Sequence, residues 1–281
     1  MPDTSRRPSE RGGTSVSSAP PPTVWARAAR SVGTPVLEVA EHGGRYLMDL
    51  ARTIRGIRGV PRGSVLEYCV KTGVEAVPIL IVIGFLMGLI LAMQASVQLK
   101  PFGATIYVAN LVGVAMVREI GPLITGVLVA GRSASGFAAE VGSAKINEEV
   151  SALTTMGLDV HQYLFTPKFL ATAAVVPALA LLTEVMGILG GFAFGVSTLH
   201  IGWSSYLAQT RDALHGLDLV SGMTKAFFYG AIIALVGTAK GMRVERGPSE
   251  VGDKARSAVV LSIVLIVITD FVFTAIFHAG E

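Results

Sequence analysis

The sequence predicts an all-α integral membrane protein with five transmembrane helices and a preceding amphipathic helix that lies at the membrane surface. Of its 281 residues, 51% are hydrophobic and only 15% are charged, whereas soluble domains carry about 25% charged residues. Several apolar stretches approach or exceed the roughly 20 residues that a helix needs to cross a bilayer. The charged residues outside these stretches are unevenly distributed, which indicates an orientation. We expect one membrane domain, over residues 74–277.

Five apolar spans are expected within this domain, and most of them contain or adjoin a charged side chain. A charge inside an apolar span is costly and is usually retained for a structural or functional reason. The first span has no charge after Glu75, and the fourth is flanked by Lys225 and Lys240. Arg118 and Glu119 lie in the second span, Glu184 in the third and Asp270 in the fifth. The expected spans are residues 74–99, 105–131, 169–198, 223–239 and 258–277.

The lysine and arginine residues predict the orientation of these spans. Residues 1–73 contain 11 of the 23, the 132–168 connection contains 3 and the 240–257 connection contains 5. Only Lys100, Arg211 and Lys225 fall on the other side, and Arg118 lies within a span. Basic residues favour the cytoplasmic side. We therefore expect a cytoplasmic N-terminus and, after five spans, an external C-terminus.

The segment before the first span has two parts. Residues 1–24 are rich in Pro, Ser, Arg and Gly, which is typical of a disordered leader, here cytoplasmic. Within residues 35–62, apolar side chains recur at helical spacing and the arginines lie mostly on another face. This pattern predicts an amphipathic helix in the plane of the cytoplasmic leaflet. A soluble helix packed on another protein is the alternative.

The sequence contains no recognisable catalytic or nucleotide-binding motif. We find no phosphate-binding GxxxxGK[ST], no HExxH and no pair of cysteines, since Cys69 is alone. GRSASG lacks the spacing of a nucleophile elbow, and GGFAFG lies in an apolar helix without a preceding strand. We therefore expect neither an enzyme nor a metal site in this chain.

Two further patterns concern helix packing and the longest cytoplasmic connection. Small residues recur every fourth position from Gly126 through Ala130, Ala134 and Ala138 to Gly142, which favours close approach of another helix, from the same chain or another. Residues 143–157 suggest a short amphipathic helix that ends at Gly157. A helix presented to the cytoplasm between two spans could receive force from an ATPase, or could be a surface helix without a partner.

The run REIGPLITGVLVAGRSASGFAAEVGSAKINEEVSALTTMGLDVHQYLFTPKFLA resembles the signature of the MlaE/YrbE permease family. The similarity continues through GILGG at 187–191 and GMRVERGPSEVGDKARSAVVLSIVLIVITDFVFTAIF at 241–277, and covers roughly residues 35–277. Members are membrane subunits of ABC lipid transporters that work with MCE-domain proteins. The resemblance implies a bacterial inner-membrane permease that forms a homodimer, and a separate ABC ATPase that binds the ATP. It implies an external MCE-domain lipid-binding partner and allows a small STAS-type regulatory subunit, with no nucleic acid and no cofactor in this chain.

The resemblance also implies where the lipid and the ATPase bind. By position, the lipid cavity is lined by Leu91, Leu99 and Phe102, together with Arg118 and Glu119. Residues 91, 95, 99 and 102 share one helical face, which agrees with that placement. The ATPase is expected at the 143–157 coupling helix, whose candidate contact residues are Glu148, Glu149, Leu153 and Gly157.

The charged pair and the other intramembrane carboxylates allow more than one interpretation. Arg118 could bind a lipid phosphate, because a guanidinium matches phosphate oxygens, while Glu119 modulates that contact. Alternatively the two could hold helices in register, and neighbours at i and i+1 need not pair with each other. For Asp270 we favour hydrogen bonding to neighbouring helices. Glu184 could be protonated or bonded to a neighbouring helix.

The function that these observations predict is movement of phospholipid or another lipid between the inner membrane and an external MCE-domain protein. The alternative is an ion-coupled secondary transporter that uses Glu119, Glu184 and Asp270 as a proton relay. Five spans do not divide into the equal halves of an inverted repeat, which argues against that alternative. A membrane-embedded lipid-modifying enzyme would require a clustered catalytic set that the sequence does not contain.

Overall fold

The computed structural model describes residues 48, 51–53, 60, 62–245 and 247–279. The chain forms two compact units, residues 1–40 and 41–281, and all described residues belong to the second. The expected leader at residues 1–24 and most of the expected interfacial helix at 35–62 lie outside the described residues.

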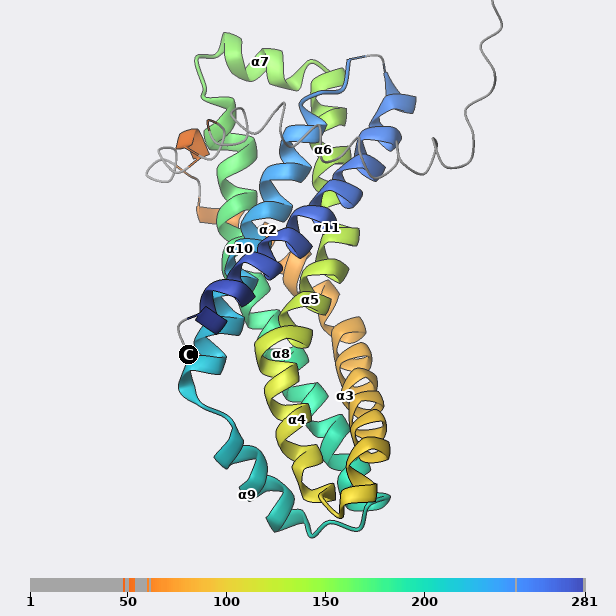
Figure 1. Ribbon diagram of the computed structural model, residues 1–281. Helices are drawn as coiled ribbons and strands as arrows, with labels where there is room; N and C mark the ends of the chain where they lie inside the picture. The colour runs from red at the N-terminus through yellow and green to blue at the C-terminus, as the bar shows by residue number, and fades with distance from the viewer. Residues whose placement is uncertain (1–47, 49–50, 54–59, 61, 246, 280–281) are drawn as a thin grey trace, which may run out of the picture. The chain divides into compact units, whose positions relative to one another are not determined.

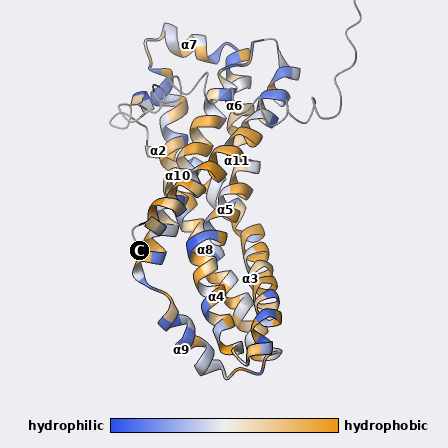
Figure 2. Cartoon of the chain, in the orientation of Figure 1, coloured by the Kyte–Doolittle hydropathy of each residue, from blue (hydrophilic) through white to orange (hydrophobic). Residues whose placement is uncertain are grey.

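The described part of the chain is helical, and five of its helical stretches are long and apolar enough to cross a membrane. This confirms the predicted number of spans. Figure 2 shows hydrophobic residues predominating along α5, α10 and α11. The five stretches are Gly63–Phe102, Thr105–Ile146, His161–Ser197, Gly216–Gly241 and Pro248–Phe277.

Each stretch extends beyond the span expected from hydropathy, because its ends are polar but still helical. Successive helices in one stretch are separated by short 3-10 or π-helical segments rather than by loops. The helices in chain order are α2 (Arg62–Gly73), α3 (Val77–Leu99), α4 (Val108–Ala115), α5 (Gly121–Val129), α6 (Ser135–Ile146), α7 (Glu149–Thr155), α8 (Thr166–Ser197), α9 (Trp203–Ala213), α10 (Gly216–Gly241) and α11 (Pro248–Ala279). The three π-helical segments are η5 (Met116–Ile120), η6 (Ala130–Ala134) and η7 (His161–Phe165).

The predicted ridge of small residues is a packing surface within the chain. All five of its members are buried, and both α10 and α11 pack against this part of the chain. A Cβ on Gly142 would meet Val251 of α11. A Cβ on Gly237 would lie 2.9 Å from the Ala134 carbonyl oxygen, and one on Gly241 would lie 2.8 Å from the Ala138 carbonyl oxygen. Close backbone approach of this kind supplies the dispersion contacts that hold helices together in lipid.

A second close packing joins α3 to α8. The buried face of α3 carries a small residue at Gly84, Gly88, Ala92 and Ser96. A Cβ on Gly88 would lie only 1.7 Å from the Gly187 carbonyl oxygen. The opposite face of α3 remains exposed in the single chain, with large apolar side chains at Ile79, Val82, Leu86, Ile90, Met93 and Val97.

Two short helices, α7 and α9, lie at opposite ends of the helices in the second unit (Figure 1). α9 is anchored by Tyr206, whose side chain is 1% exposed and contacts Gly191 and Gly195 of α8. Burial raises the pKa of Tyr206 to about 12, so its phenol is uncharged at neutral pH. α9 is therefore fixed to the end of α8.

The expected helix over residues 143–157 is divided in the structure. Residues 143–146 complete α6, and α7 covers only Glu149–Thr155. Glu148 breaks the helix because its φ is +61°, in the left-handed region that non-glycine residues rarely adopt. Gly157 ends this segment with a φ of +74°, as a C-terminal glycine is expected to do.

Candidate functional site

The charged pair Arg118–Glu119 lies on η5, in the interior of the second span. Arg118 is 13 residues from the start of that span at Thr105, a depth of about 20 Å for a helix. Pro122 follows η5 and has no backbone N–H, so it cannot donate to the carbonyl of Arg118 four residues earlier. The Gly121 N–H donates instead to the Met116 carbonyl, the i−5 bond of a π-helix. The sequence therefore removes the usual i−4 donor for the Arg118 carbonyl in the membrane interior.

Lys225 of α10 donates a hydrogen bond to the Arg118 carbonyl and also neutralises Glu119. Its side chain is completely buried, and Nζ donates to the Arg118 carbonyl oxygen (3.1 Å), to Glu119 Oε2 (2.6 Å) and to Thr274 Oγ1 (2.8 Å). The expectation that Lys225 flanks the fourth span on the external side is therefore wrong. α10 begins at Gly216, so Lys225 lies more than two turns inside it.

Asp270 completes the same cluster from α11. Its Oδ1 lies 3.3 Å from Lys225 Nζ and accepts a hydrogen bond from the Tyr229 hydroxyl at 2.7 Å. Thr274 donates to Glu119 Oε1 at 3.0 Å. Asp270 thus contacts Lys225 and Tyr229 of the neighbouring helix α10. We call Glu119, Lys225, Tyr229, Asp270 and Thr274 the Lys225 cluster.

Arg118 contacts a different residue of α10. Its Nη1 lies 3.5 Å from Asp218 Oδ1, and Asp218 Oδ2 accepts the backbone N–H of His215 at 2.8 Å. That bond is part of the capping box that starts α10. Arg118 and Glu119 therefore bond to separate acidic and basic partners on α10, at sites seven residues apart along that helix. Both interpretations of the pair, helix register and phosphate contact, remain compatible with this arrangement.

Glu184 lies in the middle of α8 and makes no described bond to the Lys225 cluster. It is 2% exposed, and within the described residues its Oε1 has no hydrogen-bond partner. Its surroundings are backbone and glycine, since Cβ atoms added to Gly121 and Gly222 would lie 2.6 Å from Glu184 Cγ and 3.4 Å from Oε1. Glycine at these two positions gives this carboxyl the space that it occupies.

The apolar residues predicted to line the lipid cavity lie at the end of α3. Leu91 and Leu99 are partly buried and pack against a core of Ala92, Val108, Val112 and Met116. Phe102 is 82% exposed. Leu91 and Leu99 therefore pack against a core that includes Met116 of η5, while the charges of η5 pair with α10 and α11.

A second polar cluster lies between α2, α6 and α8, and sequence reasoning did not detect it. Lys168 is completely buried, and its Nζ lies 2.9 Å from Glu140 Oε1 and 2.8 Å from the Tyr68 hydroxyl. Lys71 bonds the other oxygen of Glu140 at 3.1 Å. Glu140 therefore holds three helices together at the end of the second unit where α7 lies.

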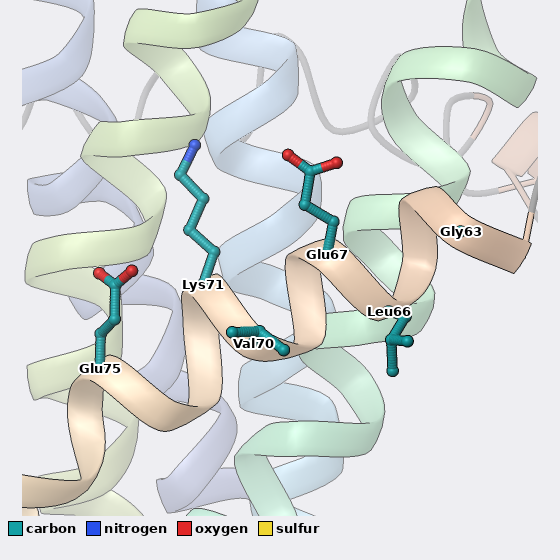
Figure 3. Close-up of a pocket in the computed structure, with 6 residues that line it drawn as sticks. All are labelled: Gly63, Leu66, Glu67, Val70, Lys71 and Glu75. Carbon is teal, nitrogen blue, oxygen red and sulfur yellow. The ribbon is translucent and has the colours of Figure 1, made fainter.

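An open hollow of about 650 Å³ runs along α2 beside this cluster. Figure 3 shows Glu67 and Lys71 of α2 and the following Glu75 pointing to one side, with Leu66 pointing away from them. Leu66 and Val70 are 67% and 50% exposed. Alternating charged and apolar positions of this kind suit a helix at the edge of the apolar layer of a membrane.

The described residues contain no group of three or more His, Cys, Asp and Glu side chains that could hold a metal ion. In the part of the chain that the structure describes, the charged side chains of the Lys225 cluster are bonded to one another.

Three relatives define the class of this protein. A probable ABC transporter permease protein of Rickettsia bellii is 32% identical over 251 residues, which cover 89% of this chain and 97% of that protein. The intermembrane phospholipid transport system permease protein MlaE of Haemophilus influenzae is 29% identical over 74% of this chain and 80% of its own length. The chloroplastic protein trigalactosyldiacylglycerol 1 of Arabidopsis thaliana is 30% identical over 77% of this chain and 62% of its own length.

The spans and these relatives define the chain as a membrane permease subunit of an ABC transporter. Such a subunit has no ATPase activity of its own. The model of the family Permease MlaE matches residues 65–276, which include all five spans almost completely. The chain belongs to the MlaE permease family, and the resemblance noted from the sequence is confirmed.

Proposed function

We propose that this chain is the membrane subunit of an ABC transporter that moves a phospholipid or related lipid between the membrane and an external carrier. Family membership supplies the class of protein, and the Lys225 cluster is the observation that supports an amphiphilic substrate. The five members of this cluster, with Arg118 next to Glu119 in the chain, place charged and polar groups in the membrane interior, and α3 and α11 carry exposed apolar side chains. A lipid needs both kinds of surface.

The proposed lipid site has an apolar and a polar part. Leu91, Leu99 and Phe102 would contact acyl chains, and Arg118 would contact the phosphate after exchanging Asp218 for it, since the guanidinium suits either anion. Glu119 is anchored to Lys225, which favours a role in positioning η5. A second copy of the chain would supply the missing wall, because α3 exposes a row of large apolar side chains that one chain leaves uncovered.

We further propose that α7 and its flanking residues transmit force from the ATPase. Glu148, Glu149 and Gly157 are exposed, Leu153 is half-buried, and Met156 is 65% exposed beside them. α7 follows α6 directly and is joined through residues 156–160 to η7 and α8. A displacement of α7 would therefore act on the second and third spans together. The basic-residue distribution supports a cytoplasmic position for this end and an external C-terminus.

The remaining partners follow from the family resemblance. An external MCE-domain protein would accept or deliver the lipid, and a STAS-type subunit could regulate the ATPase. The ion-coupled alternative has less support, because Glu119 and Asp270 share one lysine and Glu184 makes no described bond to either of them.

Mass spectrometry of lipid and protein that co-purify with the chain tests this function. We expect an ABC ATPase and a phospholipid-class lipid to accompany the wild-type chain in mild detergent. Met156→Asp should release the ATPase while lipid remains bound, and Leu91→Trp should reduce bound lipid while the ATPase remains. Ser204→Asp on α9 and Leu189→Trp on the exposed face of α8 are the matched controls, and each should leave both ligands bound. Purification of the wild-type chain with neither ligand would count against the proposal.

A further inference from the structure

A hollow of about 320 Å³ lies where three segments of the second unit meet, at the end near α7. One wall comes from residues 48 and 52, a second from η7 and a third from the last turn of α10 and the residues after it. The residues that line it include Met48, Arg52, His161, Phe165, Met242 and Arg243.

The charged groups around this hollow favour an anion. Arg52 and Arg243 place two guanidinium groups on its lining, and within the described residues no carboxylate pairs with Arg52. The end of α10 would ordinarily repel an anion through its exposed carbonyls. Here Lys145 Nζ donates to the Met242 carbonyl oxygen at 2.7 Å and offsets that charge. Asp159 lies beside His161, and its Oδ1 accepts the His161 backbone N–H at 2.9 Å.

The apolar groups of the same hollow favour a ligand with hydrocarbon attached to its anion. Phe165 is buried, and its ring lies 4.5 Å from that of His161. Met48 is 54% exposed. Methionine side chains adapt to irregular apolar ligands. A small soluble anion has no hydrocarbon that could pack against this apolar lining.

The position in the spans favours a membrane lipid as the source. His161 is the first residue of the third span, and Gly241, next to Met242, is the last residue of the fourth. The hollow therefore lies near the ends of two spans, towards the membrane surface rather than in the membrane interior. Basic pockets between transmembrane helices at this level are typical sites for anionic headgroups.

We propose that this hollow binds an anionic membrane phospholipid, with Arg52 and Arg243 contacting the phosphate and Met48, Phe165 and Met242 contacting the glycerol and first acyl carbons. This lipid is separate from the transported one, because Arg118 and the end of α3 lie in other parts of the bundle. The bound lipid would join Met48 and Arg52 to η7 at the start of the third span, immediately after the connection from α7. It would thereby stabilise the base on which α7 moves.

Photolabelling of the full chain tests this site. The chain is placed in phosphatidylcholine nanodiscs that contain a trace of a photoactivatable lipid, with a diazirine on its acyl chain close to the glycerol. In one sample this trace lipid is phosphatidylglycerol, and in the other it is phosphatidylcholine. Labelled peptides are then mapped by mass spectrometry. We expect phosphatidylglycerol to label peptides that contain Met48, Phe165 or Met242 in preference to phosphatidylcholine. Excess inorganic phosphate should not remove this label.

Substitution of the arginines measures the charge contribution. A basic residue near the membrane surface contributes about 1 kcal/mol, so Arg52→Gln or Arg243→Gln should each reduce this labelling about fivefold. Arg52→Lys and Arg243→Lys keep the charge and should retain most of it, which separates loss of charge from loss of fold. Arg211→Gln on α9 is the matched control and should label like the wild type.

Three outcomes would overturn the proposal. The first is equal labelling by the two lipids. The second is displacement of phosphatidylglycerol by inorganic phosphate, which would assign the hollow to a soluble phosphate. The third is labelling confined to peptides of residues 91–119, which would indicate the transport cavity alone. The last result would leave the proposed transport function standing, so the two proposals fail separately.

Discussion

Replacement of Lys225 by methionine should destabilise the helix bundle more than any other single lysine substitution outside the second polar cluster. Lys225 Nζ lies 2.6 Å from Glu119 Oε2 and 3.3 Å from Asp270 Oδ1. Methionine has a similar length and no charge, so the variant leaves two carboxylates without their cation. It also leaves the Arg118 carbonyl without a donor, since Pro122 cannot supply one.

The exposure of the two carboxylates sets the magnitude. Removal of one partner from a buried ion pair costs about 3–5 kcal/mol. The side chains of Asp270 and Glu119 are 17% and 36% exposed. Glu119 is therefore partly screened and contributes little of that cost. We expect about 3 kcal/mol, which corresponds to a fall in Tm of about 6–12 °C for a domain of this size.

Thermal unfolding of the purified chain in mild detergent measures this effect. Lys254→Met is the matched control, because Lys254 forms an i,i+4 pair with Glu250 at 3.4 Å that is worth only about 0.3–0.5 kcal/mol. In the triple variant Lys225→Met, Glu119→Gln, Asp270→Asn the unpaired charges are absent, and most of the lost Tm should return. A Lys225→Met variant as stable as the control, or a triple variant no better than the single one, would refute the assignment of Lys225 as the cation of this cluster.

Three other predictions concern single positions. Glu184→Gln should change stability by less than about 1 kcal/mol in thermal unfolding, because the Glu184 Oε1 atom makes no described hydrogen bond that an amide would lose; a large loss would show that the carboxylate charge is used. Gly88→Ala should cost at least about 1–3 kcal/mol through the clash with α8, whereas Gly136→Ala, with open space around it, should stabilise by up to about 1 kcal/mol in the same assay. Glu148→Gly should stabilise the turn before α7 by about 1 kcal/mol, since the φ of Glu148 is +61°. Gly157→Ala should destabilise the chain by a similar amount. A destabilising Glu148→Gly or a stabilising Gly157→Ala would contradict the left-handed backbone at these residues.

The number and order of the spans could be predicted because hydropathy acts on long segments. About 20 consecutive apolar residues have few alternatives in a membrane protein. The ends of the spans could not, because α10 begins seven residues before the expected span, in a segment where Asp218, Ser221 and two glycines lower the mean hydropathy. A capping box of His215 and Asp218 starts the helix there, and mean hydropathy does not detect it. The break at Glu148 was also missed, since a left-handed glutamate has no local sequence signal of the kind that Gly157 provides.

The candidate site illustrates the same limit at the level of single side chains. The pair Arg118–Glu119 could be found from sequence, because two adjacent charges interrupt an otherwise apolar stretch. Lys225 could not, because a lysine seven residues after Asp218 resembles the polar flank of a span. One local signal was available: Pro122 removes the donor for the Arg118 carbonyl, so a buried donor must come from elsewhere. That requirement predicts a partner without naming it, and only the packing of α10 against η5 identifies Lys225. A proline four residues after a charged position in a membrane helix is therefore a reason to look for a buried cation on a neighbouring span.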